Sequence, residues 1–311
     1  MLRKLRNASS VIALLLATTG LAAADEGGVA FWMSGQYASM SAVPPAPGWS
    51  LTTLANGYRG SESSMRVSSS LDADVETEEA ILLLQPGYAF DTKILGGTPY
   101  LSIAGGYGVT TTRLEIDTPH GDSDRSQTIS GGPDLNPFAS LSWAKGTNNL
   151  MTYLSLNVPV GSYNPDRIAN LGIGHAAIDW GAAYTYLDPD SGWEFSALAG
   201  LTYNWENPYT DYQNGIDSHL DWGASRWVNK NWELGVAGYV YYQLTDDSGA
   251  GDEVGGNRSR IAAIGPAIGY QQQWKTASLY VSLRGYQEFW AANRPEGQSV
   301  FLEASYSWLE Q

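Results

Sequence analysis

The sequence contains no cysteine and only three histidines in 311 residues. Without cysteine the chain has neither disulfides nor thiolate metal ligands, and three histidines provide little for a histidine-rich metal site. Beyond the N-terminus, no stretch approaches the roughly 18 uninterrupted apolar residues that a membrane-spanning helix needs. Basic residues are also scarce, with 17 Lys and Arg against 32 Asp and Glu. This negative balance excludes nucleic acid as a partner, because phosphate binding requires positive charge.

The first 24 residues predict a secretory signal peptide. Three basic residues at positions 3, 4 and 6 precede an apolar run that begins near Val11, and small residues follow up to Ala24. The run is too short to span a bilayer and ends in an A-x-A pattern, so we expect cleavage after Ala24. The mature chain would then carry 17 − 3 = 14 basic residues and all 32 acidic ones, a net charge of 14 − 32 = −18.

What the sequence does contain is an unusual mixture of aromatic residues and glycine. It has 12 Trp, 19 Tyr and 35 Gly, while only 16% of its residues are charged. This composition is typical of a transmembrane β-barrel, whose strands are apolar on one face only and therefore have low mean hydropathy. The clearest alternating segment runs from Trp232 to Leu244, where Trp232, Leu234 and Val236 share one face and Glu233 lies on the other.

Twelve segments show this alternation, and their spacing predicts how the chain is organised. They begin near Trp49, Ala80, Tyr100, Gly132, Leu150, Ala177, Trp193, Gly215, Trp232, Arg258, Ala277 and Gln298. Short turns are expected at 92–97, 145–147, 188–192, 229–231 and 274–276, and longer polar connections at 60–79, 116–131, 161–176, 207–214, 245–257 and 291–297. Alternating short and long connections predict an all-β fold, a transmembrane antiparallel β-barrel of about 12 strands with periplasmic short turns.

Residues 25–47 are predicted to form an N-terminal plug or leader segment before the barrel at 48–311. Three prolines between positions 44 and 47 disfavour a strand, yet the apolar side chains need cover. The plug candidates are Phe31, Trp32, Met33 and Tyr37. About twelve strands make a barrel wider than those filled by side chains and narrower than open porins, so we expect a narrow, partly plugged lumen. A loose periplasmic leader is the alternative.

One family resembles this chain in four stretches. They are GGVAFWMSGQYASMSAVPPAPGWS, WEFSALAGLTYNWENPYTDYQNGIDSHLDWGAS, GDEVGGNRSRIAAIGPAIGY and LRGYQEFWAANRPEG. Through them the chain is similar to the family of the meta-pathway of phenol degradation, over nearly the whole mature sequence. The resemblance implies a secreted outer-membrane β-barrel, associated with aromatic-compound catabolism, that helps hydrophobic or aromatic molecules cross the outer membrane. It supplies no catalytic or ligand residues.

An acidic and histidine-containing stripe is the most distinctive candidate site. Asp217, His219 and Asp221 share one face of a predicted strand, opposite Leu220 and Trp222. If the apolar face contacts lipid, the stripe points into the lumen. The full set of predicted substrate-pathway residues is Asp217, His219, Asp221, Glu206, Tyr239, Tyr241, Arg284, Tyr286 and Glu288. A merely solvated lumen wall and a catalytic or metal site are the alternatives.

No nucleophile motif accompanies this stripe. Ser218, Ser225 and Ser196 are the serines that could join His219, but Ser218 alternates to the opposite face. We therefore predict no catalytic residue, no metal and no cofactor. Acidic stretches such as 72–79 are placed in predicted outer loops, where they either bind divalent cations that bridge to lipopolysaccharide or are simply solvated.

The sequence thus predicts a passive channel for small hydrophobic or aromatic compounds in the outer membrane of a Gram-negative bacterium. Its expected partners are outer-membrane lipid and lipopolysaccharide, a small hydrophobic or aromatic ligand, and the barrel-assembly machinery. Three alternatives stay open: a structural or adhesive barrel with a sealed lumen, a barrel hydrolase that depends on His219, and a soluble periplasmic protein.

Overall fold

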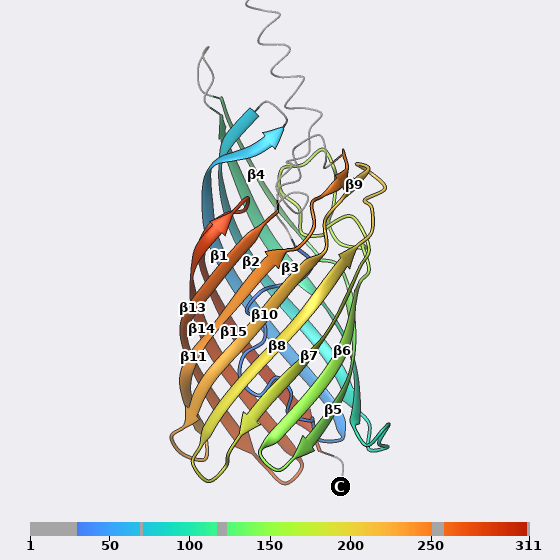
Figure 1. Ribbon diagram of the computed structural model, residues 1–311, viewed down its shortest axis with the longest axis vertical. Coiled ribbons are helices and arrows are strands. Elements are labelled where there is room, and N and C mark those ends of the chain that lie inside the picture. The colour runs from blue at the N-terminus through green and yellow to red at the C-terminus, as the bar shows by residue number, and fades with distance from the viewer. Residues whose placement is uncertain (1–29, 69–70, 117–122, 251–257, 310–311) are drawn as a thin grey trace, which may run out of the picture.

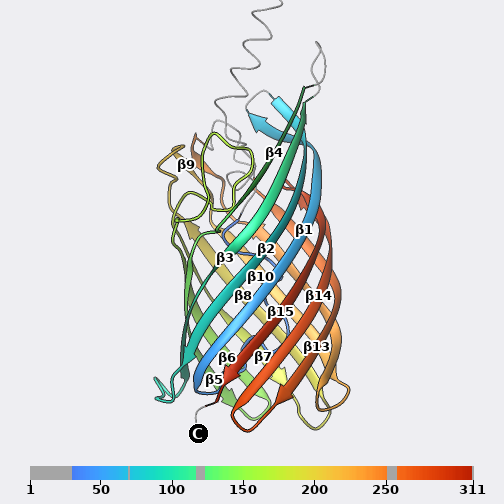
Figure 2. The same ribbon diagram turned by 180° about the vertical axis from the view of Figure 1, so that it is seen from behind.

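The chain forms a closed antiparallel β-barrel of twelve strands (Figures 1 and 2). The computed structural model describes residues 30–68, 71–116, 123–250 and 258–309. The barrel strands are β1 (Gly48–Ser68), β2 (Leu71–Ala89), β3 (Thr98–Ile116), β5 (Asn136–Lys145), β6 (Asn148–Asn157), β7 (Ala177–Leu187), β8 (Trp193–Asn204), β10 (Asp217–Trp227), β11 (Trp232–Gln243), β13 (Arg260–Gln273), β14 (Ala277–Ala292) and β15 (Glu296–Trp308). The described residues include no helix that is long and apolar enough to cross a membrane.

Three further strands lie at the end of the barrel opposite the short turns. β4 (Ser123–Gly131) pairs with the outer half of β3, while β5 pairs with the other half of the same strand. β9 (Tyr212–Gln213) and β12 (Ser248–Gly249) form a small separate pair. The barrel closes where β1 pairs with β15, from Ser50 opposite Ser307 to Ser61 opposite Glu296. Closure satisfies the strand edges, which a bilayer cannot hydrate, and the predicted fold class is confirmed.

The outer face of the barrel carries an apolar belt with aromatic residues at both ends. Leu82, Leu234, Leu283 and Leu302 are all close to half exposed on it. Paired rings mark the end with the short turns, for example Trp232 with Tyr270 at 4.9 Å between centroids. Other pairs mark the opposite end: Tyr203 with Trp205, and Tyr242 with Trp290. Such a surface requires a bilayer, so this is a transmembrane barrel of the outer-membrane type, and the soluble alternative is excluded.

Two predicted long connections are wrong, because the chain there continues as strand. β1 runs on to Ser68 and β2 starts at Leu71, inside the loop predicted at 60–79; β4 occupies most of the loop predicted at 116–131. In these extensions the alternation is inverted: Val75 and Leu114 are buried inside the barrel, while Glu76 and Arg113 form an ion pair outside it. The outer surface is polar there because the strands have left the apolar belt. The connection at 291–297 is also shorter than predicted, since β14 and β15 leave only 293–295 between them.

The depth of a residue on the outer face should decide how much a charge destabilises the barrel. Leu302 lies midway along β15, opposite Ala55 and Leu283 of the neighbouring strands. Leu302→Arg is expected to lower the free energy of unfolding by about 2–4 kcal/mol, because a guanidinium at the bilayer midplane loses its hydration. Urea unfolding in phospholipid vesicles measures this. Gln298→Arg is the matched control on the same face near the outer end of the strand, with an expected cost of about 0–1 kcal/mol. Equal costs for the two variants would contradict the placement of Leu302 at the bilayer midplane.

Candidate functional site in the barrel lumen

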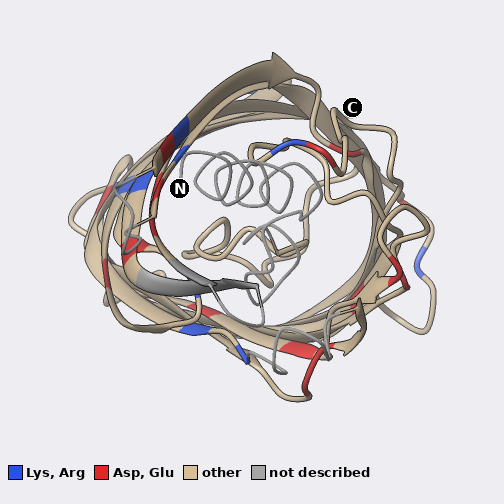
Figure 3. Cartoon of the chain, turned by 90° about the horizontal axis from the view of Figure 1, so that it is seen from above, with Lys and Arg blue, Asp and Glu red and all other residues tan. Residues whose placement is uncertain are grey.

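Residues 30–47, which we call the N-terminal lumen segment, run through the inside of the barrel (Figures 1 and 3). Its backbone is held by side chains that point inward from the strands. Asp221 on β10 accepts hydrogen bonds from the amides of Gly35 at 3.0 Å and Tyr37 at 3.2 Å. Glu194 on β8 accepts one from the Met40 amide at 2.9 Å. Carboxylates bonded to backbone N–H groups form strong, charge-assisted hydrogen bonds, so the segment is fixed at defined points.

An adjoining part of the wall, three strands away from β10, holds the same segment through its carbonyl groups. Arg284 on β14 donates to the Gln36 carbonyl and to Glu303, both at 3.0 Å, and the Tyr286 hydroxyl donates to the Gly35 carbonyl at 3.1 Å. Gly35 has a positive φ of 87°, and a side chain there would come within 2.8 Å of Tyr239. The close fit requires glycine at this position, both for the backbone conformation and for the space between the rings.

His219 lies beneath an aromatic residue of the lumen segment. The Trp32 ring stacks on the imidazole with 3.7 Å between centroids and 14° between planes, and both side chains are buried. His219 Nε2 lies 2.9 Å from Asp179 Oδ2, and the Tyr153 hydroxyl donates to Asp179 Oδ1 at 2.7 Å. Thr202 donates to the same carboxylate at 2.6 Å. The imidazole is therefore enclosed between Asp179 and Trp32 instead of lining an open passage.

The stripe that the sequence singled out is brought into the lumen, but its three residues have separate tasks. Asp221 binds the lumen segment, His219 packs under it, and Asp217 accepts a hydrogen bond from Asn204 at 2.8 Å. Among the described residues, no group of three or more His, Cys, Asp or Glu side chains is placed to hold a metal ion. The sequence could not show that an irregular segment 186 residues away supplies the partners of Asp221.

The serines that could have completed a hydrolytic triad have other partners. Ser225 donates to Glu194 at 2.8 Å, Ser196 donates to the same carboxylate, and Ser218 donates to the Tyr242 carbonyl at 2.8 Å. The hydroxyl that does lie near His219 is that of Tyr153, 3.3 Å from Nε2. In this arrangement none of these three serines is hydrogen-bonded to His219.

Tyrosines and one carboxylate make up the opposite side of the lumen. Glu288 accepts hydrogen bonds from the hydroxyls of Tyr239 at 2.6 Å and Tyr58 at 3.2 Å. Tyr241 is fully buried, with the Arg294 guanidinium 4.9 Å from its ring centroid. Eight of the nine predicted lumen residues thus point inward. Glu206 is the exception: β8 ends at Asn204, and Glu206 is exposed in the connection that follows, because the strand does not extend as far as its alternation suggested.

Two cavities lie on either side of the lumen segment. The larger has a volume of about 210 Å³ and is bounded by the outer halves of β1, β2 and β3 and by residues 168–173. The smaller, of about 90 Å³, lies toward the short turns and is lined by Thr52, Gln85 and Phe138. Residues common to both linings form the partition between them: Phe31, Trp32, Met33, Leu83 and Asn136. Three of the four plug candidates therefore separate the cavities, and Tyr37 stacks on Trp32 at 5.6 Å.

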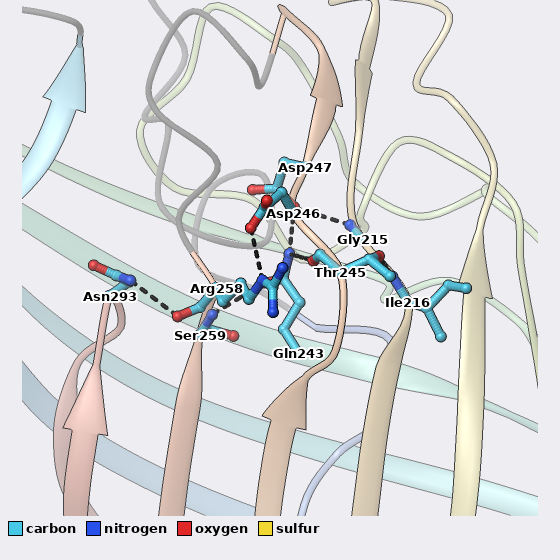
Figure 4. A network of polar contacts seen from close by, with 9 residues as sticks. All are labelled: Gly215, Ile216, Gln243, Thr245, Asp246, Asp247, Arg258, Ser259 and Asn293. Atoms are coloured by element: carbon cyan, nitrogen blue, oxygen red, sulfur yellow. Dashed lines mark hydrogen bonds and ion pairs between the residues drawn. The ribbon is translucent and has the colours of Figure 1, made fainter.

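A polar network at the outer end ties the connections between strands together (Figure 4). Asp247 accepts hydrogen bonds from the Gly215 amide at 2.9 Å and from Gln243 Nε2 at 2.6 Å. On the solvent side, Arg258 donates to Asp246 at 2.6 Å, and this contact holds the pKa of the Asp246 carboxyl below its usual range. The β8–β10 and β11–β13 connections are thereby fixed to each other at the outer end of the barrel.

These features define a class: an antiparallel outer-membrane barrel whose lumen contains a fixed N-terminal segment. The chain belongs to the family described as "Putative MetA-pathway of phenol degradation", whose model matches residues 68–304, so the family predicted from the sequence is confirmed.

Several solved structures are similar to the chain at low sequence identity. The chain is similar to an outer membrane channel from Pseudomonas putida F1, with 15% identity, 86% of this chain and 97% of that chain covered, and a TM-score of 0.60. It is also similar to the transport unit of the autotransporter AIDA-I from Escherichia coli, with 12% identity, 91% and 95% covered, and a TM-score of 0.49. A Pseudomonas aeruginosa FadL homologue matches with 9% identity, 94% and 97% covered, and a TM-score of 0.43. No curated protein matches the chain by sequence.

Proposed function

We propose that this protein is an outer-membrane channel for the passive entry of small hydrophobic or aromatic compounds, with the N-terminal lumen segment as its plug. The observation that carries the proposal is the partition of Phe31, Trp32 and Met33 between two cavities inside a transmembrane barrel. The family description supports an aromatic cargo, and the similar P. putida structure is itself an outer membrane channel. No cofactor and no energy source are required by this scheme.

The volumes of the two cavities indicate where passage is controlled. A cavity of about 150 Å³ lined by apolar side chains holds benzene. The outer cavity, at about 210 Å³, can therefore hold one substituted ring, whereas the inner one, at about 90 Å³, cannot. A molecule passes only when Phe31 and Met33 shift aside, so that the partition opens and the two cavities join into one space. The plug consequently works as a gate in this proposal, and the barrel wall stays fixed.

Entry into intact cells tests the function, because lipopolysaccharide makes the outer membrane a barrier to hydrophobic compounds. Gram-negative cells that produce the protein should take up radiolabelled phenol several-fold faster than cells carrying an empty vector. Membrane fractionation and heat-modifiable migration check that the barrel is inserted in the cells that produce it. Equal rates with and without a correctly inserted protein would instead favour the sealed structural or adhesive barrel.

The hydrolase alternative makes a different prediction from the channel. For a channel, we expect neither the wild type nor His219→Gln to hydrolyse esterase or lipase substrates. For a hydrolase that depends on His219, the wild type would hydrolyse them and the variant would not.

Two partners complete the proposal. The barrel-assembly machinery would insert the chain, and lipopolysaccharide would surround the polar outer extensions of β1, β2 and β3.

A further inference from the structure

One carboxylate in the larger cavity receives no hydrogen bond from the part of the chain that the structure describes. The register of β2 places Glu79 between Tyr58 of β1 and Thr110 of β3, on the inward face of the wall. Its side chain lines the larger cavity. Gly60 follows Tyr58 on the same face of β1, and the Tyr58 ring lies over this glycine. The Tyr58 hydroxyl therefore donates to Glu288 and to the Pro295 carbonyl instead of to Glu79.

The other carboxylates of this cavity are fully engaged. Glu288 accepts from two tyrosine hydroxyls and from the Gly297 amide at 2.7 Å. Asp134 accepts from the amides of Gly161 at 2.7 Å and Ile173 at 2.9 Å, and from an Asn157 side chain. Glu79, in contrast, accepts no hydrogen bond from any residue of the described ranges. The half-buried Glu79 carboxylate faces the cavity with its acceptor positions open, so this position favours an occupant that brings an O–H or N–H group.

The rest of the wall suits a ring. Val75, Ile81 and Leu83 flank Glu79 on the inward face of β2, and Phe301 of β15 lines the same cavity. At about 210 Å³ the space exceeds the roughly 150 Å³ that holds benzene, and leaves room for one or two polar substituents. The charged side chains of the lining narrow the class of ligand further. Three carboxylates and one guanidinium line the cavity, and like charges repel at short range, so an anionic ligand is disfavoured.

We propose that this cavity binds uncharged ring compounds that carry an O–H or N–H donor, and that Glu79 accepts their hydrogen bond. The residue thereby selects such compounds over hydrocarbons, which lack the donor, and over carboxylates of the same size, which it repels. This inference rests on the proposed function and names the substrate class of the same channel.

Binding of three probes to the purified full-length protein in detergent tests the inference by calorimetry. At pH 8.5, where the Glu79 carboxyl is ionised, phenol should bind at least about tenfold more tightly than toluene or benzoate, since a hydrogen bond to a charged group is among the stronger polar contacts. Glu79→Leu should remove the preference for phenol over toluene. Glu79→Gln keeps an acceptor but no charge, and should bind benzoate more tightly than the wild type does. Glu78→Gln is the matched control, because Glu78 faces outward beside Arg59 and should change nothing.

The outcomes separate the binding site from the transport function. A phenol preference that persists in Glu79→Leu overturns the inference. Heat-modifiable migration shows whether the leucine variant folds as a barrel. If it does not fold, Glu79→Gln provides the independent test. Faster cellular entry of phenol and toluene alike, unaffected by either substitution, refutes the inference and leaves the channel intact. Probe binding that depends on Glu79 without faster entry into cells supports the site and refutes the transport function.

Discussion

Deletion of residues 30–47 is expected to raise the single-channel conductance of the barrel at least about tenfold, because a barrel of this size without its filling contains a continuous water path. The lumen segment supplies Phe31, Trp32 and Met33 to the partition between the two cavities. The barrel itself should survive, since the β1–β15 ladder begins at Ser50, beyond the deleted residues. Planar-bilayer recording of single insertions in symmetrical salt measures the change.

Two variants make the comparison specific. Phe31→Ala removes one ring of the partition and should give a smaller increase than the deletion. Leu95→Ala changes a side chain that is 87% exposed in the turn between β2 and β3, far from the lumen segment, and should leave the conductance unchanged. An unchanged conductance after the deletion would mean that the strands alone seal the lumen, and the structural or adhesive barrel would then be the better description.

The sequence predicts the strands well wherever lipid forces one face to be apolar. β7, β8, β11 and β14 begin at the predicted residues, because their alternation starts with the apolar belt. It fails where strands leave the bilayer. Along 73–78 the outward positions are acidic and the inward ones are Ala73, Val75 and Thr77, which inverts the expected pattern. The acidic run therefore resembled a solvated loop, and Glu79 was assigned to the outside although it lines a cavity.

The sequence pattern predicts only part of the lumen site, for a physical reason. Period-two alternation decides which face a side chain occupies, and so it places Asp221, His219, Tyr239 and Glu288 inside. It says nothing about contacts with an irregular segment. Gly35 and Met40 have positive φ values, and the segment has no periodicity that could reveal its path. Hydrogen bonds across 186 and 154 residues of sequence, to Asp221 and Glu194, emerge only from the closed fold.

Loss of the Asp221 carboxylate should release the lumen segment. Its two oxygens accept the amides of Gly35 and Tyr37, and Asp221 is itself 1% exposed. Hydrogen bonds to a charged group contribute about 1.5–3 kcal/mol each, so Asp221→Leu is expected to shift the balance between seated and released segment by about 3 kcal/mol, roughly a hundredfold. Asp221→Asn keeps one acceptor and should have an intermediate effect.

A single engineered thiol can report this release, because the natural chain contains no cysteine. Ser34 lies in the lumen segment, and its hydroxyl is buried with no hydrogen-bond partner among the described residues, so Ser34→Cys should disturb little. The rate of modification by a water-soluble maleimide then follows the fraction of released segment, and should rise strongly in Asp221→Leu. Asp217→Asn is the matched control on the same face of β10, since Asp217 bonds to Asn204 rather than to the lumen segment. If both variants react at the wild-type rate, Asp221 is not the anchor, and the contacts of Glu194, Arg284 and Tyr286 must hold the segment without it.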